Sequence, residues 1–223
     1  MNLNIFPLDK YSFNFPDPLY ANDEGLIAYG GDLNPNRIIT AYTKGIFPWY
    51  NKNDPILWWS PNPRMVLSLD DFKVSKSLTK TINKNIYEIK FDTNFEQTII
   101  ECANARKHKE GTWILDEVIE AYIKIHEMGF AHSFEAYENG QLVGGGYGIN
   151  IGNIFCGESM FAKKSDASKV ALFYLVERLK QKGFKYIDCQ VPSSHLASLG
   201  AKNILRKDFL SLIENSISNP LEF

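Results

Sequence analysis

Cysteine is scarce in this sequence, and no two cysteines are closely spaced. The 223 residues include three of them, Cys102, Cys156 and Cys189. An odd number at wide spacing argues against a disulfide framework and fits a reducing compartment. There is no C-x-x-C pair, and His126 and His132 do not stand at metal-ligand spacing with other ligands. We therefore expect no structural zinc and no other metal.

Long apolar runs and an excess of positive charge are absent as well. No run approaches the ~20 apolar residues that span a bilayer, and the first residues, MNLNIFPLDK, lack the charged and apolar regions of a signal peptide. We therefore expect a soluble, cytoplasmic protein with no membrane partner. The formal net charge is −2, so an RNA partner would need a local basic patch. No G-x-G-x-x-G opens a predicted helix and no Walker A lysine occurs, so no nucleotide cofactor is expected.

The chain is rich in apolar and aromatic residues, and its two parts are patterned differently. Hydrophobic residues make up 44% and aromatic residues 13%, which is enough for a packed core. Residues 1–61 are rich in proline, glycine and aromatic residues. They predict a small domain with one helix, which begins after Asn34 and ends before Gly45. The Pro-Asn-Pro at 61–63 predicts a boundary, with a larger domain at 62–223.

The larger part alternates between helical and strand periodicities. Helices are predicted at 74–83, 94–106, 115–128, 166–183 and 206–215. Strands are predicted at 87–91, 133–138, 141–149, 154–161 and 186–191. The dipeptide Asn139-Gly140 predicts a hairpin turn within an antiparallel meander, and the long helix is expected to be capped by Asp166 or Ser165 and to end at Gly183. This mixture of helices and hairpins is typical of the α+β class.

Two polar residues interrupt the apolar strand YIDCQV at 186–191. Residues i and i+2 of a strand share a face, so Asp188 and Gln190 are expected to lie side by side, with Cys189 turned away. Polar groups on such a strand are costly unless other groups satisfy them. One interpretation is structural, with both side chains hydrogen-bonded to a neighbouring helix end. The other is a catalytic pair, whose site His195 could also line, although a core or surface role is more common for a single histidine.

A second candidate site lies on the predicted strands that contain GGGYG and FCGESMF. Glu158 lies near Phe155 and Met160, a composition typical of the wall of an apolar pocket, and its carboxylate could hold an amine. The alternative is an exposed carboxylate at a sheet edge. The three glycines at 144–146 predict the close approach of another backbone or of a ligand.

A run of lysines marks the predicted helix at 74–83. The lysines recur at spacings of three and four, and they are Lys73, Lys76, Lys80 and Lys84. Apolar residues recur on the opposite side of the helix. A solvated helix face is the ordinary interpretation. Because no acidic residue lies between Lys73 and Asn85, a face that binds phosphates is the alternative.

Several strings, taken together and in order, resemble one known family. The most specific are GIFPW at 45–49, WWSP at 58–61, CGESMF at 156–161 and DCQ at 188–190, with SLGA shortly after it. They resemble the leucyl/phenylalanyl-tRNA–protein transferases, and matching segments cover nearly the whole chain. The resemblance implies an α+β chain with a small N-terminal domain joined to a larger, acetyltransferase-like (GNAT-like) domain. It also implies transfer of Leu or Phe from aminoacyl-tRNA to proteins that begin with Arg or Lys, which marks those proteins for degradation.

The resemblance also implies roles for particular residues. The implied catalytic residues are Asp188, Gln190 and Glu158. The implied amino-acid pocket is formed by Phe155, Met160 and Leu172, and the implied adenosine surface by Trp49 and Trp113. The implied tRNA-binding cluster is Lys76, Lys80 and Lys84.

Two positions depart from the family's pattern. Where the family usually carries a larger apolar residue that lines the pocket, this sequence has Gly146. The pocket is therefore expected to be deeper and to favour Phe, unless a neighbour such as Met160 or Phe155 fills the gap. Where the family commonly has an asparagine after DCQV, this sequence has Pro-Ser-Ser at 192–194, which can alter the loop near the site.

The implied reaction starts from an activated ester, so it requires neither a nucleotide nor a metal. An amide is not a base, so Gln190 is expected to accept an N–H of the attacking amine through its carbonyl, while Asp188 holds and polarises its NH₂. The tRNA 2′-hydroxyl could relay a proton to the leaving oxygen. The alternatives are another GNAT-like enzyme, using acetyl-CoA or ligating cell-wall peptides, and a non-catalytic tRNA-binding module. No glycine-rich pyrophosphate loop precedes the helix at 166–183, and a monomer is expected.

Overall fold

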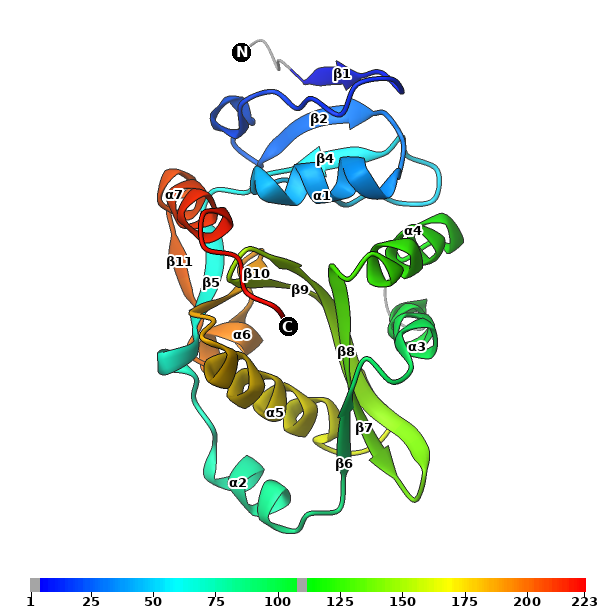
Figure 1. The fold of residues 1–223 in the computed structure, drawn as a ribbon, viewed down its shortest axis with the longest axis vertical. Coiled ribbons are helices and arrows are strands. Elements are labelled where there is room, and N and C mark those ends of the chain that lie inside the picture. Colours follow the sequence, from blue (N-terminus) through cyan, green and yellow to red (C-terminus); the bar gives the residue numbers. More distant parts are fainter. Residues whose placement is uncertain (1–4, 108–111) are drawn as a thin grey trace.

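Two β-sheets organise the chain in the computed structural model, which describes residues 5–107 and 112–223 (Figure 1). The first sheet has the strand order β1-β2-β4-β3, formed by Phe6–Leu8, Leu26–Gly30, Leu57–Trp59 and Phe47–Pro48. The second sheet has the order β11-β5-β10-β9-β8-β7-β6. The chain passes from the first sheet to the second between Trp59 and Arg64.

The second sheet is assembled from distant parts of the sequence. Its strands are β5 (Arg64–Ser68), β6 (Glu88–Phe91), β7 (Ala131–Glu138), β8 (Gln141–Ile151), β9 (Ile154–Ala162), β10 (Tyr186–Gln190) and β11 (Lys202–Ile204). The predicted antiparallel meander is confirmed in β7, β8 and β9, and Asn139 and Gly140 both have positive φ at its first turn. In contrast, β9 and β10 run parallel. Helix α5 (Ala167–Lys182) makes the crossover that a parallel pair requires.

Helices cover both faces of the second sheet (Figure 1). On one face α5 packs against β7 and β8, whereas α3 (Phe95–Lys107) and α4 (Asp116–Glu127) lie on the other. The remaining helices are α1 (Pro35–Thr43), α2 (Lys76–Asn83), α6 (Ser194–Ser198) and α7 (Arg206–Ile217), with 3-10 turns at Pro18–Tyr20 and Leu69–Asp71. Within residues 5–107 and 112–223, no helix is both long enough and apolar enough to cross a membrane.

Helix α1 begins where the sequence predicts. The Asn34 side chain accepts a hydrogen bond from the Asn36 N–H at 3.0 Å, and Pro35 is the first helical residue. Gly45 follows the helix with φ 68°, a conformation that favours glycine. These local signals fix where α1 begins and ends, and its buried side then packs against α4 and β8.

The predicted side-chain cap of α5 is wrong, although its end is correct. Asp166 occupies the N-cap position with φ 61°, but its side chain makes no capping hydrogen bond. Its carboxylate instead pairs with Lys169 at 2.9 Å. At the other end Gly183 closes the helix with φ 92°, as predicted.

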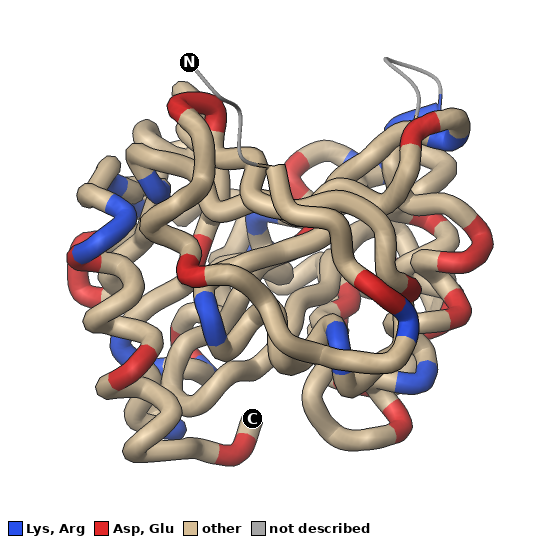
Figure 2. The backbone as a smooth tube through the Cα atoms, turned by 90° about the horizontal axis from the view of Figure 1, so that it is seen from above, with Lys and Arg blue, Asp and Glu red and all other residues tan. Residues whose placement is uncertain are grey.

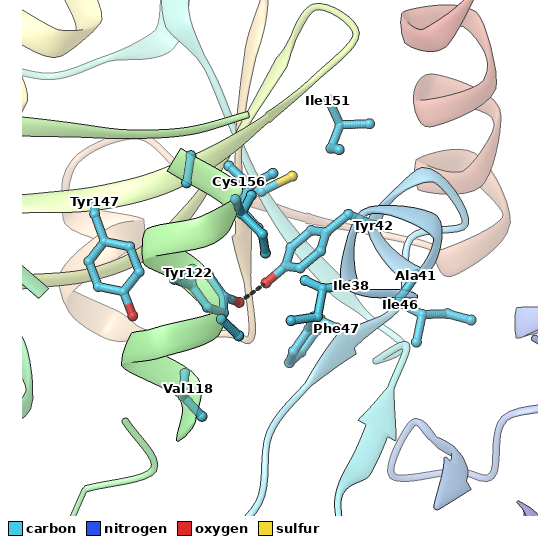
Figure 3. Packing of buried hydrophobic residues seen from close by; sticks show 14 of the residues in the cluster. Ile38, Ala41, Tyr42, Ile46, Phe47, Val118, Tyr122, Tyr147, Ile151 and Cys156 are labelled. Carbon is cyan, nitrogen blue, oxygen red and sulfur yellow. Dashed lines mark hydrogen bonds between the residues drawn. The ribbon is translucent and has the colours of Figure 1, made fainter. Parts of the chain in front are cut away.

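The two sheets share a continuous buried core (Figure 3). Ile38 and Tyr42 of α1 belong to the same apolar cluster as Val118 and Tyr122 of α4 and Tyr147 of β8. All five side chains are at most 1% exposed. This packing holds the first part of the chain against the second and places the Tyr42 hydroxyl beside the second sheet.

The structure confirms the α+β class and, in the larger part of the chain, adds two strands and one α-helix that the sequence did not predict. These are the strands β5 and β11 and the short helix α6. The glycines of β8 do mark a close approach, as expected. A Cβ atom at Gly144 would lie 2.6 Å from the Cβ of Ala167, so the glycine lets the start of α5 rest directly on the sheet.

Candidate functional site

A buried ion pair between β5 and β10 anchors the site. Arg64 donates from Nε and Nη2 to the two carboxylate oxygens of Asp188, at 2.8 and 2.6 Å. Its third nitrogen, Nη1, donates to the Gly45 carbonyl at 3.1 Å. Arg64 is 1% exposed and Asp188 is fully buried. A bidentate pair of this kind fixes both side chains, because each would be strongly destabilising without the other.

The backbone at Gln190 departs from a regular strand. The pairing of β10 with β5 shifts register between Asp188 and Gln190, and Gln190 has φ 63°, a conformation that is strained for a residue other than glycine. The Gln190 N–H donates to Asp188 Oδ1 at 2.9 Å, which holds this conformation in place. The expectation of a regular i, i+2 pair is therefore wrong, because a bulge redirects the Gln190 side chain.

The Gln190 side chain is held by Glu158 and not by Asp188. Its Nε2 donates to Glu158 Oε1 at 2.8 Å, while the Asp188 carboxylate is occupied by Arg64 and by the backbone. Within residues 5–107 and 112–223, no group donates a hydrogen bond to the side-chain carbonyl oxygen (Oε1) of Gln190. The prediction that Asp188 polarises this amide is corrected, since Glu158 is the carboxylate in contact with it.

Two buried tyrosines complete the environment of Glu158. The Tyr42 hydroxyl donates to Glu158 Oε1 at 2.6 Å, and the Tyr122 hydroxyl donates to Oε2 at 3.3 Å. The two hydroxyl oxygens are themselves 2.9 Å apart (Figure 3). Burial raises the pKa of both tyrosines well above the usual value, and the Glu158 charge adds to this. They therefore remain protonated donors, and Glu158 is not the exposed edge carboxylate of the alternative interpretation.

Glu158 itself is poised to exchange a proton near neutral pH. Burial, together with the negative charge of Asp188, raises its pKa to about 7, although the hydrogen bonds from Tyr42, Tyr122 and Gln190 act in the opposite direction. A carboxylate with such a pKa is suited to general acid–base chemistry at neutral pH. We call this group of six residues the polar centre; it consists of Arg64, Asp188, Gln190, Glu158, Tyr42 and Tyr122.

An apolar cavity of about 240 Å³ opens beside the polar centre. Its apolar wall comes from the second sheet and from α5 and α6, and it consists of Leu67, Phe134, Phe155, Met160, Leu172, Leu175, Ile187, Leu196 and Leu199. Its polar lining includes Glu158, Asp188 and His195. A cavity of this size suits one apolar side chain better than a drug-sized ligand, which needs ~300–1,000 Å³. Phe155, Met160 and Leu172 line it together, as the resemblance implies, and Cys189 also faces it, contrary to expectation.

The deeper pocket expected at Gly146 does not form. A Cβ atom on Gly146 would lie 2.5 Å from the Ser159 carbonyl oxygen, 2.6 Å from the Phe134 ring and 2.7 Å from Met160 Cγ. Met160, one of the two neighbours predicted to fill this gap, therefore does so. The second side chain at the gap is Phe134 and not the predicted Phe155. Gly146 is not among the residues that line the cavity.

A second, more polar pocket of about 300 Å³ adjoins the other side of the polar centre. Trp49 and Trp113 line it, together with Gln190 and Arg106. Trp49 is 44% exposed, and its ring lies 6.0 Å from that of Trp59. Exposed indole faces are suited to stacking against a nucleobase. A wider hollow of about 460 Å³ near Tyr87 and Tyr137 shares no lining residue with the polar centre.

The three lysines implied to bind tRNA lie outside these pockets. Lys76 and Lys80 are exposed on α2, and Lys84 is exposed directly after it. Among the residues described, none of the three forms an ion pair. Helix α2 lies at the end of the molecule opposite the first sheet (Figure 1). Elsewhere along the chain, acidic and basic residues are interspersed (Figure 2). A basic surface on this protein is therefore a local one, such as the exposed face of α2.

Four residues of the site were missed from the sequence: Arg64, Arg106, Tyr42 and Tyr122. Tyr42 and Tyr122 occur at core positions of amphipathic helices, where a tyrosine is indistinguishable from an apolar residue. Arg64 follows a proline-rich segment and gives no periodic signal. The other three lie within longer segments that also resemble the family, and this resemblance is the signal that could have identified them. The segments are AYTKGIFPWY at 41–50, DPILWWSPNPR at 54–64 and AYIKIHEMGFAHSFE at 121–135. The described part of the chain holds no cluster of three or more His, Cys, Asp or Glu residues suited to a metal.

Comparisons with known proteins agree on one family. The model of the family described as leucyl/phenylalanyl-tRNA protein transferase matches residues 66–214, and that of its N-terminal domain matches residues 31–62. A protein of Sulfurimonas denitrificans with that name is 54% identical over 202 residues, which cover 90% of this chain and 88% of the relative. A namesake from Pseudoalteromonas atlantica is 48% identical over 222 residues, covering 99% and 94% respectively.

Solved structures of low sequence identity also resemble this chain. An aminoglycoside acetyltransferase from an uncultured soil metagenomic sample aligns with a TM-score of 0.40 and 13% identity, over 58% of this chain and 88% of its own. The assignment to a family therefore rests on the sequence matches.

Proposed function

Because the chain belongs to the leucyl/phenylalanyl-tRNA protein transferase family, we propose that it transfers Leu or Phe from charged tRNA to the α-amine of proteins that begin with Arg or Lys. One observation carries the proposal. Gln190 lines the aromatic pocket, and its amide is bonded to Glu158, which lines the apolar cavity. An aminoacyl ester with its side chain in the cavity and its adenosine in the aromatic pocket would present its carbonyl carbon beside this pair.

The proposed reaction exchanges one bond for another. The acceptor nitrogen forms a bond to the ester carbon, and the bond from that carbon to the ribose 3′-oxygen breaks. The amine loses one proton and the ribose oxygen gains one, with the neighbouring 2′-hydroxyl as the proposed relay. No oxidant, nucleotide or metal enters this balance.

Four members of the polar centre have a proposed part in this step. The free carbonyl of Gln190 accepts an N–H of the attacking amine and orients it. Glu158 holds the Gln190 amide and, with a pKa of about 7, takes up the proton that the amine loses. An α-amine has a pKa of about 7.7–8.0, so both groups are partly deprotonated near neutral pH. Asp188 and Arg64 are positioning residues, because they act through the backbone of Gln190.

The remaining roles follow from the positions of the two pockets. Phe155, Met160 and Leu172 would bind the transferred side chain, and Trp49 and Trp113 the terminal adenosine. The lysines at 76, 80 and 84 would contact tRNA phosphates. We further propose that the protein acts as a monomer in the cytoplasm, on acceptors that the added Leu or Phe marks for degradation.

A direct assay tests the proposal. Purified protein is mixed with radiolabelled Leu-tRNA or Phe-tRNA and a peptide that begins with Arg, and the labelled peptide is separated and counted. The controls are the same peptide with an acetylated N-terminus and a peptide that begins with Ala. Transfer to the Arg peptide alone is expected. Binding of tRNA with no transfer to any peptide would favour a non-catalytic tRNA-binding module, and acetylation of the peptide by acetyl-CoA would favour a different enzyme.

A further inference from the structure

Arg106 lies at the junction of the two pockets. It is the residue shared by the lining of the apolar cavity and the lining of the aromatic pocket. It belongs to the last turn of α3, on the face of the second sheet that carries α4. A substrate that occupies both pockets must therefore pass the Arg106 side chain at the point where the two pockets meet.

A hydrogen bond to a neutral hydroxyl anchors the Arg106 side chain and does not neutralise its positive charge. Its Nε donates to Ser159 Oγ at 3.0 Å, and Ser159, the residue after Glu158 on β9, is 5% exposed. Within residues 5–107 and 112–223, no carboxylate lies within ion-pair distance of Arg106. This contrasts with Arg64, whose three nitrogens are all bonded within the polar centre. Among the described residues, none bonds to the terminal nitrogens of Arg106, and these nitrogens can therefore meet an incoming ligand.

The chemistry at this junction calls for a positive charge. Attack of an amine on an ester carbon places a negative charge on the carbonyl oxygen, and fixed donors that meet this oxygen accelerate acyl transfer. Within the polar centre, Arg64 is already neutralised by Asp188. The remaining charged group is the Glu158 carboxylate, whose negative charge cannot stabilise an oxyanion. A guanidinium is permanently charged and offers several donors in one plane.

We propose that Arg106 is a catalytic residue that binds the carbonyl oxygen of the aminoacyl ester and stabilises the oxyanion formed on it. The inference rests on the proposed function and adds an electrophilic group to it. In the first half of the step the amine adds to the carbon and the carbonyl electron pair moves to the oxygen bound by Arg106. In the second half that pair returns and the ribose oxygen leaves with a proton.

The test separates an ester contact from a phosphate contact. Two donors are compared in single-turnover assays at saturating concentration: Phe-tRNA, and 3′-O-phenylalanyl-adenosine, which has no phosphate. For Arg106→Ala we expect the rate to fall about 10²–10³-fold with both donors, as for loss of other oxyanion donors. Donor affinity should stay within about threefold of the wild type, since the contact strengthens in the transition state. Added methylguanidinium should partly restore the rate of Arg106→Ala.

Three controls keep the result specific. Lys107→Ala removes a neighbouring exposed charge of α3 and should leave the rate unchanged. Ser159→Ala removes the anchor but not the guanidinium, and should lower the rate by a smaller factor than Arg106→Ala. Arg106→Lys, which keeps the charge but loses the planar fork, should lie between wild type and Arg106→Ala.

Two outcomes would overturn the inference while leaving the proposed function intact. One is an Arg106→Ala variant that transfers as fast as an active wild type. The other is a defect with Phe-tRNA that disappears with the nucleoside donor, which would assign Arg106 to a tRNA phosphate. If the wild type itself transfers from neither donor, the proposed function fails and the inference falls with it.

Discussion

The polar centre and the lysine face, which we define as Lys76, Lys80 and Lys84, use charge in opposite ways. In the polar centre, Arg64 and Asp188 are at most 1% exposed and are paired with each other. The lysines are exposed on and beside one helix, and no described residue pairs with them. The first region is a fixed network, whereas the second is a set of independent, hydrated cations.

The difference shows where charge affects the stability of the fold and where it affects association with a partner such as tRNA. Two charges 4 Å apart interact by about 1 kcal/mol in water and about 4 kcal/mol at the effective dielectric of a protein. Loss of one member of the polar centre should therefore change stability and chemistry together. Loss of the lysines should change only salt-dependent association, because water and ions already screen them.

The largest effect is expected from breaking the buried ion pair. Arg64→Met leaves the Asp188 carboxylate buried without its partner, and the free energy of unfolding should fall by about 3–5 kcal/mol. The matched control is Lys202→Met, which breaks an exposed pair with Asp71 at 2.6 Å and should cost about 0–1 kcal/mol. Both are measured by urea unfolding. Equal losses in the two variants would contradict the contrast between buried and exposed charge.

At Gln190 we expect a large effect on the rate of transfer and a smaller one on the affinity for aminoacyl-tRNA. Gln190→Ala should slow transfer about 10²–10³-fold in single-turnover assays, because the amine loses its orienting acceptor. Gln190→Gly removes the same side chain but favours the observed φ of 63°. The two variants should lose rate equally, with the glycine variant the more stable. A normal rate in Gln190→Gly would show that the backbone, and not the amide, matters.

The pH dependence of stability tests Glu158. Its pKa of about 7 in the folded chain exceeds the ~4.3 of an unperturbed glutamate. The folded state therefore binds more protons between these values, and the free energy of unfolding should fall as pH rises from about 4.5 to 7. Relative to Glu158→Gln, the wild type should lose up to ~3 kcal/mol across this window. Urea unfolding at several pH values measures it.

The control for that measurement is Glu127→Gln, at an exposed carboxylate that ends α4. This variant should follow the wild-type pH profile. If Glu158→Gln also follows it, Glu158 is ionised throughout the window and cannot take up the amine's proton as proposed.

The smallest effect on stability is expected at the lysine face. Replacing Lys76, Lys80 and Lys84 with Ala should change the free energy of unfolding by less than about 0.5 kcal/mol. If the lysines contact phosphates, the slope of log affinity for tRNA against log salt should flatten by roughly 0.7–0.9 per lysine. The matched control replaces three exposed lysines outside α2, Lys10, Lys124 and Lys207. An equal change of slope in both triple variants would show that the lysine face is an ordinary solvated surface.

The sequence by itself determined the features that depend on neighbouring residues. Asn34, Pro35 and Gly45 delimit α1 because capping and turn preferences act within a few residues. Asn139-Gly140 marks the hairpin for the same reason. The lysine face could be recognised because its members share one helix at regular spacing. The order and composition of the family's strings also predicted a site at Asp188, Gln190 and Glu158, three residues that the structure brings into contact.

Only the tertiary structure decided which groups of the site touch. Arg64 and Asp188 are 124 positions apart in the sequence, and Tyr42 and Glu158 are 116 apart, so no local periodicity connects them. The bulge at Gln190 reassigned its amide from Asp188 to Glu158, because one extra residue in a strand reverses the faces that alternation predicts. The filled gap beside Gly146 was equally hidden, since the volume available there depends on how Phe134 and Met160 pack from neighbouring strands.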